Sequence, residues 1–529
     1  MSRYYITTPI YYPNAEPHLG HVYTTIATDA VARFHRLRGQ DTYFLTGTDE
    51  HGIKMVKTAA ALGIEPRQLA EQTVAIFKNL WKELGITNDD FLRTTQDRHK
   101  SAVQEIVRRL LAKDDIYLGT YEGWYDEGQE AFVTETEAKN EDYKSSISGR
   151  PLTRYSESSY FFRLTKYAPR VLQYILDHPE FLQPESRRNE VISKLKAGVE
   201  DLSISRASLQ WGIPMPNDPQ HVVYVWIDAL SNYTTALGYA SADESLFKTY
   251  WPADVHLIGK EILWFHGVYW PAMLLSLGLE LPRTIFAHGW WTSGGRKMSK
   301  SMGNFIDLGK LRSVIQTYSL DALRYYLLRA APFGADLDWT ETGLTMSFNE
   351  LKNVLGNCLN RTIKMVERYR NGRLPSAGEL HPIDTKLLAS AADLPRTVSA
   401  AYERLELQQG AMLPVELARA VNGYVDATEP FKLAKDPEQS ARLDTVLNTA
   451  AQVVHRCLIC LLPILPEKAA MGLQQLSIDP AGKTLRQLYD HPPLDGAVLA
   501  AAQPLFPNVP AVSPAPGGPG EGKKPLAGE

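Results

Sequence analysis

The N-terminal residues 3–21, RYYITTPIYYPNAEPHLGH, decide the fold. The aromatic and β-branched run at 3–8 predicts a buried strand, and the Pro-, Asn- and Gly-bearing stretch 9–20 predicts a turn. A helix is expected over 21–38, where a glycine ends it, and a second strand follows at 42–46. This β-loop-α-β order is the first half of a doubly wound parallel sheet, in which ligands bind at loops leaving the carboxyl ends of the strands.

Length and composition limit the class of protein. The chain has 529 residues, 44% hydrophobic and 22% charged, which is typical of a globular protein and excludes a disordered or fibrous chain. Lys plus Arg number 56 against 60 Asp plus Glu, so any RNA contact must use a local basic face. No apolar run approaches the roughly 18 residues that cross a bilayer, and no secretory leader is recognisable. With only three cysteines, we expect a cytoplasmic protein that binds no membrane.

The sheet is interrupted and then resumed. Short aromatic-rich stretches between charged loops over 115–211 are typical of an insertion. The resumed part is expected to contain strands at 221–227, 255–258 and 284–288, helices at 228–238 and 261–278, and a Gly-rich loop at 289–296. Beyond about residue 345, a helical period in the apolar residues, clearest from Leu443 to Leu461, predicts a helical bundle.

The first candidate site is His18-Leu19-Gly20-His21, which follows the first strand and opens the helix. Backbone N–H groups and the helix dipole favour phosphate there, and two imidazoles can donate to phosphate oxygens. Gly20 lets a flat base approach the backbone. The alternative is a pair of surface histidines beside a turn, but the position after a strand favours the nucleotide site.

A second candidate site is the string KMSKS at residues 297–301, between Gly294-Gly295 and Gly303. Two lysines on such a loop can close on a polyphosphate and stabilise the charge that develops on it. A solvated basic loop is the alternative. An exact five-residue string is rare by chance, and the pairing with HLGH favours a site for nucleotide chemistry.

Both strings resemble the HIGH and KMSKS signatures of class I aminoacyl-tRNA synthetases. The stretches FLTGTDEHG, EDLSISR, VVYVWIDALSNY, HLIGKEILWFH and GRKMSKSMGN are most similar to the methionyl-tRNA synthetase branch, and the resemblance extends to about residue 500. It implies an α/β chain with a Rossmann-type doubly wound parallel sheet, an inserted connective domain and an α-helical bundle that binds the anticodon. The expected segments are catalytic domain 1–114, insertion 115–215, catalytic domain with the KMSKS loop 216–345, anticodon-binding bundle 346–500 and flexible Pro/Gly-rich tail 501–529.

The resemblance also implies an activity. ATP and L-methionine would react to methionyl-adenylate and pyrophosphate, and the methionyl group would pass to the 3′ terminal adenosine of tRNA(Met), including the initiator tRNA. Such chemistry can rest on positioning and on charge stabilisation around phosphorus, without a covalent enzyme intermediate. Mg²⁺ is expected with ATP, held mainly by phosphate oxygens and water.

The resemblance assigns residues to each substrate. The catalytic residues are His18, His21, Lys297 and Lys300. ATP would contact these four together with Gly20, Gly259, Glu261 and Ser299. Methionine would lie among Ile10, Tyr12, Trp226, Ala229, Leu230, Tyr233, Ile262 and His266, with Asp49 pairing with its ammonium group. The anticodon would contact Asn357, Arg361 and Phe431.

For several of these residues, a structural role is the alternative to the functional role that the resemblance implies. The helical face Trp226, Ala229, Leu230 and Tyr233 has the spacing of ordinary core. Glu261 stands where the family has an aspartate that would face the ribose, and its extra methylene alters that contact. Arg206 is a candidate near the reacting centre or a surface salt bridge. Phe431 stands where the family commonly has a tryptophan, and a core aromatic at a helix end is its alternative.

The sequence departs from many relatives in two respects. No cysteine occurs in 115–211, so the zinc knuckle that many relatives carry is absent and we expect no structural zinc. No β-barrel of the kind that dimerises some relatives follows the bundle, so we expect a monomer. Cys457 lies on an apolar stripe, so it and Cys460 are expected to be buried thiols.

Two other functions remain open. An RNA-binding protein that has lost catalysis is disfavoured by the intact HLGH, KMSKS and Asp49. A synthetase for leucine, isoleucine or valine is disfavoured because those relatives typically carry a large editing domain.

Overall fold

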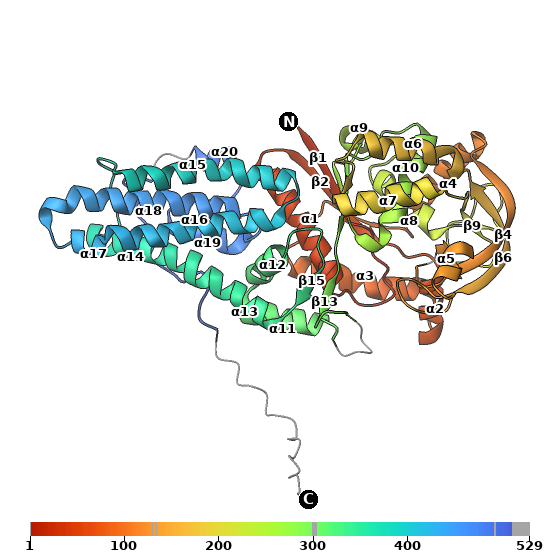
Figure 1. Ribbon diagram of the computed structural model, residues 1–529, viewed down its shortest axis with the longest axis horizontal. Coiled ribbons are helices and arrows are strands. Elements are labelled where there is room, and N and C mark those ends of the chain that lie inside the picture. The colour runs from red at the N-terminus through yellow and green to blue at the C-terminus, as the bar shows by residue number, and fades with distance from the viewer. Residues whose placement is uncertain (1, 130, 134, 299–303, 491–493, 510–529) are drawn as a thin grey trace, which may run out of the picture.

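The computed structural model describes residues 2–129, 131–133, 135–298, 304–490 and 494–509. Three parts follow one another along the long axis of the molecule (Figure 1). A parallel sheet lies in the middle, a helical bundle forms one end, and an antiparallel sheet lies at the other end. Within the described ranges, no helix is both long and apolar enough to cross a membrane.

The central sheet confirms the predicted fold class. Its six strands are all parallel and have the order β3-β2-β1-β11-β12-β7. Their bounds are β1 Arg3–Thr7, β2 Asp41–Thr48, β3 Asp90–Arg93, β7 Leu182–Gln183, β11 Val255–Gly259 and β12 Thr284–His288. The chain builds outward from β1 in one direction and resumes at β11 in the other, so the order reverses between β1 and β11. Ligands of doubly wound sheets bind at the carboxyl ends of the strands at such a switch.

Helix α1 (Leu19–Leu37) joins β1 to β2 and begins two residues before the predicted start. His18 is its N-cap residue, and the helix ends before Gly39, whose φ of +81° suits a residue without a side chain. Most of α1 is buried because the sheet covers one side and the later helices cover the other. The helix therefore lies between the central sheet and the helices that follow it.

The insertion forms its own antiparallel sheet of order β5-β4-β6-β8. Its strands are β4 Ile116–Asp126, β5 Ala131–Val133, β6 Thr153–Phe162 and β8 Leu202–Ser203, accompanied by α5 Glu135–Asn140, α6 Leu164–Asp177 and α7 Glu185–Ala197. Strand β7 returns from the insertion to pair with β12. The insertion is thus anchored to the central sheet by a strand of two residues, which the sequence analysis does not predict.

The second half of the catalytic part differs from prediction in three places. Residues 221–227 form only the short strand β10 (Val222–Val223), and helix α8 (Val225–Thr235) begins inside the predicted strand. The predicted helix 261–278 is a 3₁₀ turn η1 (Lys260–Ile262), a π-helix η2 (Phe265–Tyr269) and α10 (Trp270–Leu277). The predicted Gly-rich loop contains β13 (Trp291–Ser293) and β14 (Arg296–Lys297), which join β15 (Leu337–Trp339). Every residue of α8 is buried, so it has no polar face to reveal a helical period.

The remaining helices lie around and between these elements. In the catalytic part they are α2 Ile53–Leu62, α3 Pro66–Glu83, α4 Asp97–Ala112, α9 Ser245–Tyr250, α11 Leu308–Tyr318 and α12 Leu320–Arg329. Toward the C-terminus they are α13 Glu341–Glu350, π-helix η4 Leu351–Gly356, α14 Asn357–Arg370, α15 Pro382–Glu403, α16 Leu407–Thr428, α17 Pro430–Leu433, α18 Ser440–Leu461, α19 Pro466–Gln475 and α20 Leu485–Tyr489.

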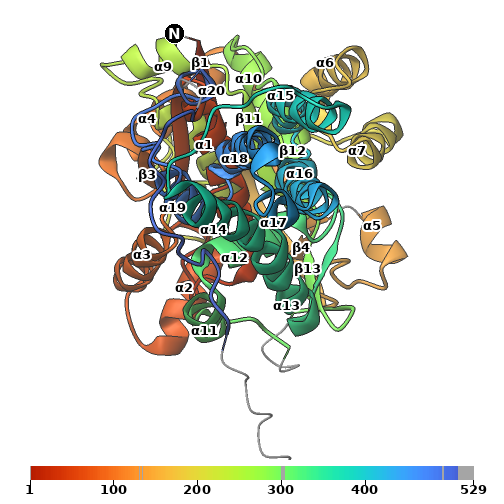
Figure 2. The same ribbon diagram turned by 90° about the vertical axis from the view of Figure 1, so that its left-hand side faces the viewer.

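The predicted bundle is confirmed, with α18 at its centre (Figure 2). The apolar stripe from Leu443 to Leu461 is buried, and Cys358, Cys457 and Cys460 are buried free thiols. In the described part of the predicted tail, 501–509, Leu505 and Phe506 are buried in the bundle core and are not part of a flexible segment. The prediction for 510–529 lies outside the described residues.

A buried ion pair joins α1 to the bundle. Arg324 of α12 lies 2.8 Å from the carboxylate of Asp29 in α1, and both side chains are 0% exposed. The same guanidinium donates to the carbonyls of Pro463 and Ile464 at 3.0 Å, directly after α18. Burial would raise the pKa of Asp29, but the nearby Arg324 and Arg33 outweigh it and hold this pKa below its ordinary value.

We predict that Arg324→Leu lowers the free energy of unfolding by about 3–5 kcal/mol, because it leaves the Asp29 carboxylate buried without its main partner. Urea titration measures this change. The control is Arg312→Leu, which removes an exposed pair with Glu83 and should cost at most about 1 kcal/mol. Equal losses in the two variants would contradict the role given to the buried pair.

Candidate active site

The two histidines of HLGH stack on each other at the N-terminus of α1, with ring centroids 3.8 Å apart. His18 Nδ1 accepts a hydrogen bond from Gly20 N–H at 3.0 Å, and His21 Nδ1 accepts from His18 N–H at 3.2 Å. A neutral imidazole that accepts at Nδ1 carries its proton at Nε2, so each ring keeps one N–H to donate. One helix N–H predicted to bind phosphate, that of Gly20, is therefore capped internally, and the imidazole N–H groups add donors to the other backbone N–H groups of the first turn.

The neighbouring histidines are neutral at physiological pH. Burial lowers the pKa of His21 well below its ordinary value, and His18 lowers it further. Burial likewise lowers the pKa of His288, which ends β12 and lies 2.7 Å from the hydroxyl of Thr24 in α1. These rings can donate hydrogen bonds but add no charge, so a phosphate there must find its positive charge elsewhere.

The predicted ATP contacts Gly259 and Glu261 lie at the carboxyl end of β11. A side chain at Gly259 would place its Cβ 2.6 Å from the Glu261 carboxylate, so a larger residue there would displace that group. The exposed Glu261 accepts a hydrogen bond from the indole N–H of Trp290 at 2.7 Å. Lys260 Nζ lies 4.3 Å from the centre of the same Trp290 ring. The switch point thus carries a carboxylate beside an aromatic face.

The KMSKS loop follows β13 and β14. Lys297 ends β14 and pairs with Thr292 across the hairpin. Ser299 and Lys300 lie outside the described residues. The hairpin of β13 and β14 pairs with β15 in a three-stranded sheet that is separate from the sheet containing β12.

Asp49, the expected partner of the ammonium group, is 3% exposed at the end of β2. Its backbone N–H donates to the Tyr11 carbonyl at 2.9 Å, and the Tyr11 ring lies 4.7 Å from that of His21. One tyrosine therefore touches both the nucleotide motif and the loop of Asp49. The flanking Ile10 and Tyr12 are half-buried, and Lys54 Nζ lies 4.5 Å above the Tyr12 ring.

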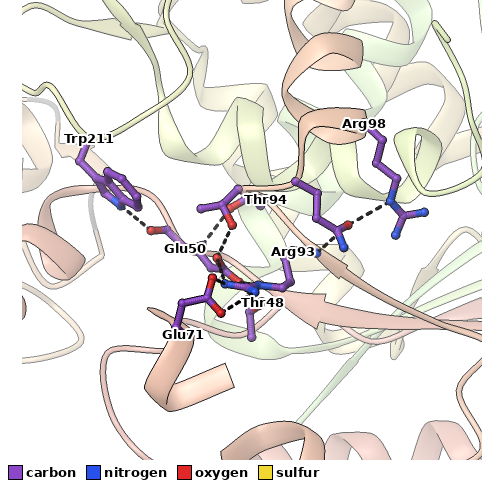
Figure 3. A network of polar contacts seen from close by, with 9 residues as sticks. Thr48, Glu50, Glu71, Arg93, Thr94, Arg98 and Trp211 are labelled. Carbon is purple, nitrogen blue, oxygen red and sulfur yellow. Dashed lines mark hydrogen bonds and ion pairs between the residues drawn. The ribbon is translucent and has the colours of Figure 1, made fainter. Parts of the chain in front are cut away.

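The residue after Asp49 is fixed by a buried ionic network (Figure 3). Glu50 is 0% exposed and accepts from Arg93 Nε at 2.7 Å and Arg93 Nη2 at 3.0 Å. The Thr48 hydroxyl donates to the same carboxylate at 2.7 Å, and Trp211 donates to the Glu50 carbonyl at 2.6 Å. The sequence analysis does not predict this network. Its only local signal in the sequence is the pair of acidic residues in GTDEHG.

The expected methionine wall lies on α8 and η2. Tyr233 donates its hydroxyl hydrogen to His266 Nε2 at 2.7 Å, because His266 Nδ1 donates to the Ile262 carbonyl at 2.9 Å. Both side chains are buried, and burial lowers the pKa of His266 to about 4. The neutral ring and its hydroxyl partner form a fixed polar group inside an otherwise apolar wall.

The rest of the wall is aromatic and apolar. Trp226 stacks flat on Phe265, with ring centroids 3.7 Å apart and 4° between the planes. Ala229 and Leu230 follow on α8 and are buried. The structure thus brings the eight predicted side-chain contacts onto three neighbouring segments: the turn after β1, α8 and η1–η2. Polarizable aromatic faces of this kind suit a thioether.

Arg206 is buried, and its ion pair with Glu157, in which Nε lies 3.9 Å from the carboxylate, is buried too and does not lie on the surface. Arg206 is 6% exposed, its Nη1 donates to the Ser205 carbonyl at 2.7 Å, and its guanidinium lies 4.3 Å from the Tyr224 ring centre. With Gly52 and Tyr125 it lines a small cavity between the loop after β2, the insertion and α8. A role of Arg206 near the reacting centre stays a prediction.

The three predicted anticodon contacts lie on the bundle. Asn357 starts α14 directly after the π-helix η4 and is exposed. Arg361, one turn further, pairs with Asp426 of α16 at 2.7 Å. Phe431 of α17 is 49% exposed, which contradicts the core-aromatic alternative.

Within the described ranges, no three His, Cys, Asp or Glu side chains lie close enough together to hold a metal ion. The absence of structural zinc stays a prediction. Mg²⁺ held by phosphate oxygens and water would need no such cluster.

A doubly wound sheet with donors at the first helix N-terminus, an acidic group at the next strand end and an apolar wall defines a nucleotide-dependent enzyme of the Rossmann class. The family model described as "tRNA synthetases class I (M)" matches residues 4–141 and 136–363. The chain therefore belongs to the class I aminoacyl-tRNA synthetases, in the methionine–tRNA ligase family.

Individual relatives agree with this family. The chain is 45% identical over 519 residues to the methionine–tRNA ligase of Halalkalibacterium halodurans, covering 96% of this chain and 78% of that one. It is 46% identical over 518 residues to that of Enterococcus faecalis, covering 96% and 77%. Methionyl-tRNA synthetase of Mycobacterium tuberculosis, solved in complex with methionyl-adenylate, superposes with a TM-score of 0.92 at 40% identity, covering 96% of this chain and 100% of that one.

The neutral buried histidines predict a pH dependence of stability. His266 has a pKa of about 4 in the folded protein and about 6.5 when unfolded, so the unfolded state gains the proton first as pH falls. Stability is full above pH 6.5 and declines below it, and at pH 5 His266 alone should cost about 2 kcal/mol. Urea titrations at pH 7.5 and 5.0 measure the loss. His266→Gln, which can still accept from Tyr233, should show a smaller loss, and an unchanged one would contradict this assignment.

Proposed function

We propose that the protein is a methionine–tRNA ligase that activates L-methionine with ATP to methionyl-adenylate and pyrophosphate. The methionyl group then passes to the 3′ terminal adenosine of tRNA(Met), including the initiator tRNA. The observation that carries the proposal is the Tyr11 bridge, which holds the HLGH histidine pair and the Asp49 loop together. Adenylate formation requires this proximity, because a substrate carboxylate must reach the α-phosphate of ATP.

The proposed ATP site uses neutral and charged groups for different tasks. His18 and His21 donate Nε2–H to phosphate oxygens, and Gly20 gives the nucleotide room at the helix end. Gly259 and Glu261 face the nucleoside at the β11 end. Lys297, Ser299 and Lys300 of the KMSKS loop supply the remaining contacts, and the two lysines supply the positive charge that the neutral histidines lack. Mg²⁺ bound with ATP neutralises further phosphate charge and is held by phosphate oxygens and water.

The proposed methionine site holds its substrate at two ends. The Asp49 carboxylate binds the ammonium group, and the thioether lies among Ile10, Tyr12 and the wall of α8 and η2. The Tyr233–His266 pair then gives the pocket a polar group at fixed position. The stacked aromatic rings and the Tyr233–His266 pair suit a thioether better than a branched hydrocarbon side chain, which favours methionine over leucine, isoleucine or valine.

The proposed anticodon surface consists of the exposed Asn357 and Phe431 and the half-buried Arg361. Amide and guanidinium groups hydrogen-bond to base edges, and a phenylalanine face stacks on an unpaired base. The monomeric state and the cytoplasmic location stay predictions from the sequence.

The first test is ATP–pyrophosphate exchange without tRNA. Methionine should drive the exchange, whereas leucine, isoleucine, valine and homocysteine should give much lower kcat/KM. Exchange driven by another amino acid would contradict the pocket assignment while keeping the class. If no amino acid supported exchange with Mg²⁺ present, the protein would be an RNA-binding relative without catalysis.

A second prediction concerns Asp49. Asp49→Asn should raise the KM for methionine by about 10- to 100-fold, because a hydrogen bond to a charged group contributes about 1.5–3 kcal/mol. The KM for ATP should stay near its original value in the same exchange assay. Asp97→Asn at the exposed start of α4 is the control and should change neither constant. Equal rises in both KM values for Asp49→Asn would argue against an ammonium contact.

A further inference from the structure

One buried carboxylate of the wall helix α8 has no role in the proposed chemistry. Asp228 Oδ2 lies 2.6 Å from His51 Nδ1, and its Oδ1 lies 2.7 Å from His99 Nε2. The three side chains are at most 5% exposed. Burial alone would raise the pKa of Asp228, but His51 and His99 outweigh it and hold the pKa below its ordinary value. The buried group is thus a carboxylate with a hydrogen-bond donor at each oxygen.

The two histidines belong to different elements. His51 lies two residues after Asp49, on the loop that leaves β2. His99 belongs to α4, and its Nδ1 lies 2.7 Å from the hydroxyl of Thr235 at the end of α8. Asp228 precedes Ala229 and follows Trp226 by two residues on α8. Its carboxylate therefore connects the Asp49 loop to the helix that forms the side-chain wall.

The loop is also held from its other side. Glu50, between Asp49 and His51, is fixed by Arg93 at the end of β3 and by the Thr48 hydroxyl, as Figure 3 shows. Consecutive residues are thus clamped to β3 on one side and to α8 on the other. Asp49 is adjacent to Glu50 and two residues from His51, so the two contacts together restrict its position relative to α8.

We propose that Asp228 is a positioning residue that fixes the distance between Asp49 and the wall of α8, and thereby sets the length of the amino acid that the site accepts. The inference rests on the proposed role of Asp49. An amino acid bound at its ammonium group and at its side-chain end must match that distance. One methylene in a rigid apolar pocket is worth about 10- to 200-fold in kcat/KM, and a loosened pocket loses part of this discrimination.

The test compares substrates of different length in ATP–pyrophosphate exchange. Asp228→Asn replaces one of the two acceptors by a donor at nearly constant volume. We expect the KM for methionine to rise about 10-fold while the KM for ATP is unchanged. The preference in kcat/KM for methionine over ethionine, which is one methylene longer, and over S-methylcysteine, which is one shorter, should fall about fivefold.

A matched control separates positioning from general destabilisation. Asp254→Asn alters another buried aspartate, which accepts from Tyr5 N–H at 2.7 Å at the amino end of β11, far from the carboxyl-end site. It should leave the length preference unchanged. A loss of preference common to both variants, or equal losses in all constants for Asp228→Asn, would overturn the proposal.

Variants of His51 test the same contact if Asp228→Asn fails to fold. His51→Ala should reproduce the loss of length preference, and His51→Asn should restore it, because the Asn amide can donate from nearly the position of Nδ1. Identical preferences in these two variants would also overturn the proposal. An Asp49→Asn variant with unchanged methionine KM would instead contradict the proposed ammonium site itself.

Discussion

The buried pair between Asp29 and Arg324 is the interaction on which the arrangement of the protein depends. Asp29 lies in α1, whose first residues carry the histidine pair, and Arg324 also binds the carbonyls that follow α18. Because both charges lie away from water, the desolvation cost offsets much of their attraction. The pair thus contributes chiefly a fixed geometry: it holds α12 against α1, and separating the bundle from the sheet would remove the two carbonyl acceptors of the buried Arg324 guanidinium.

The sequence predicts those parts of the fold whose signals are local. The sequence predicts the β1-α1-β2 unit because an aromatic and β-branched run, a turn and a glycine that ends the helix follow one another within 46 residues of chain. Residues 221–227 are mispredicted because α8 is buried on every side and has no polar face to show its period. Strand β7 has two residues, and its place depends on pairing with β12 about 100 positions later.

In the candidate site, too, the residues in local motifs are predicted from the sequence and the residues that hold them are not. Resemblance identifies His18, His21, Asp49, Tyr233 and His266, which lie in recognisable strings. In the structure Tyr11 contacts both His21 and the Asp49 loop, and Tyr233 binds His266. The groups that hold them are missed because their partners are distant in sequence: Arg93 is 43 residues from Glu50, and Asp228 is 177 from His51. Such long-range pairs leave no periodic pattern and no fixed spacing in the sequence, so they are visible only in the folded structure.

Two π-helices stand at the proposed recognition surfaces: η2 contains His266, and η4 ends directly before Asn357. A π-turn accommodates one more residue than an α-turn. Deleting that residue would turn everything after it by about 100° around the helix axis, since each α-helical residue advances by that angle. The length of these two segments is therefore constrained as strictly as their composition, and insertions or deletions there would be more damaging than most substitutions.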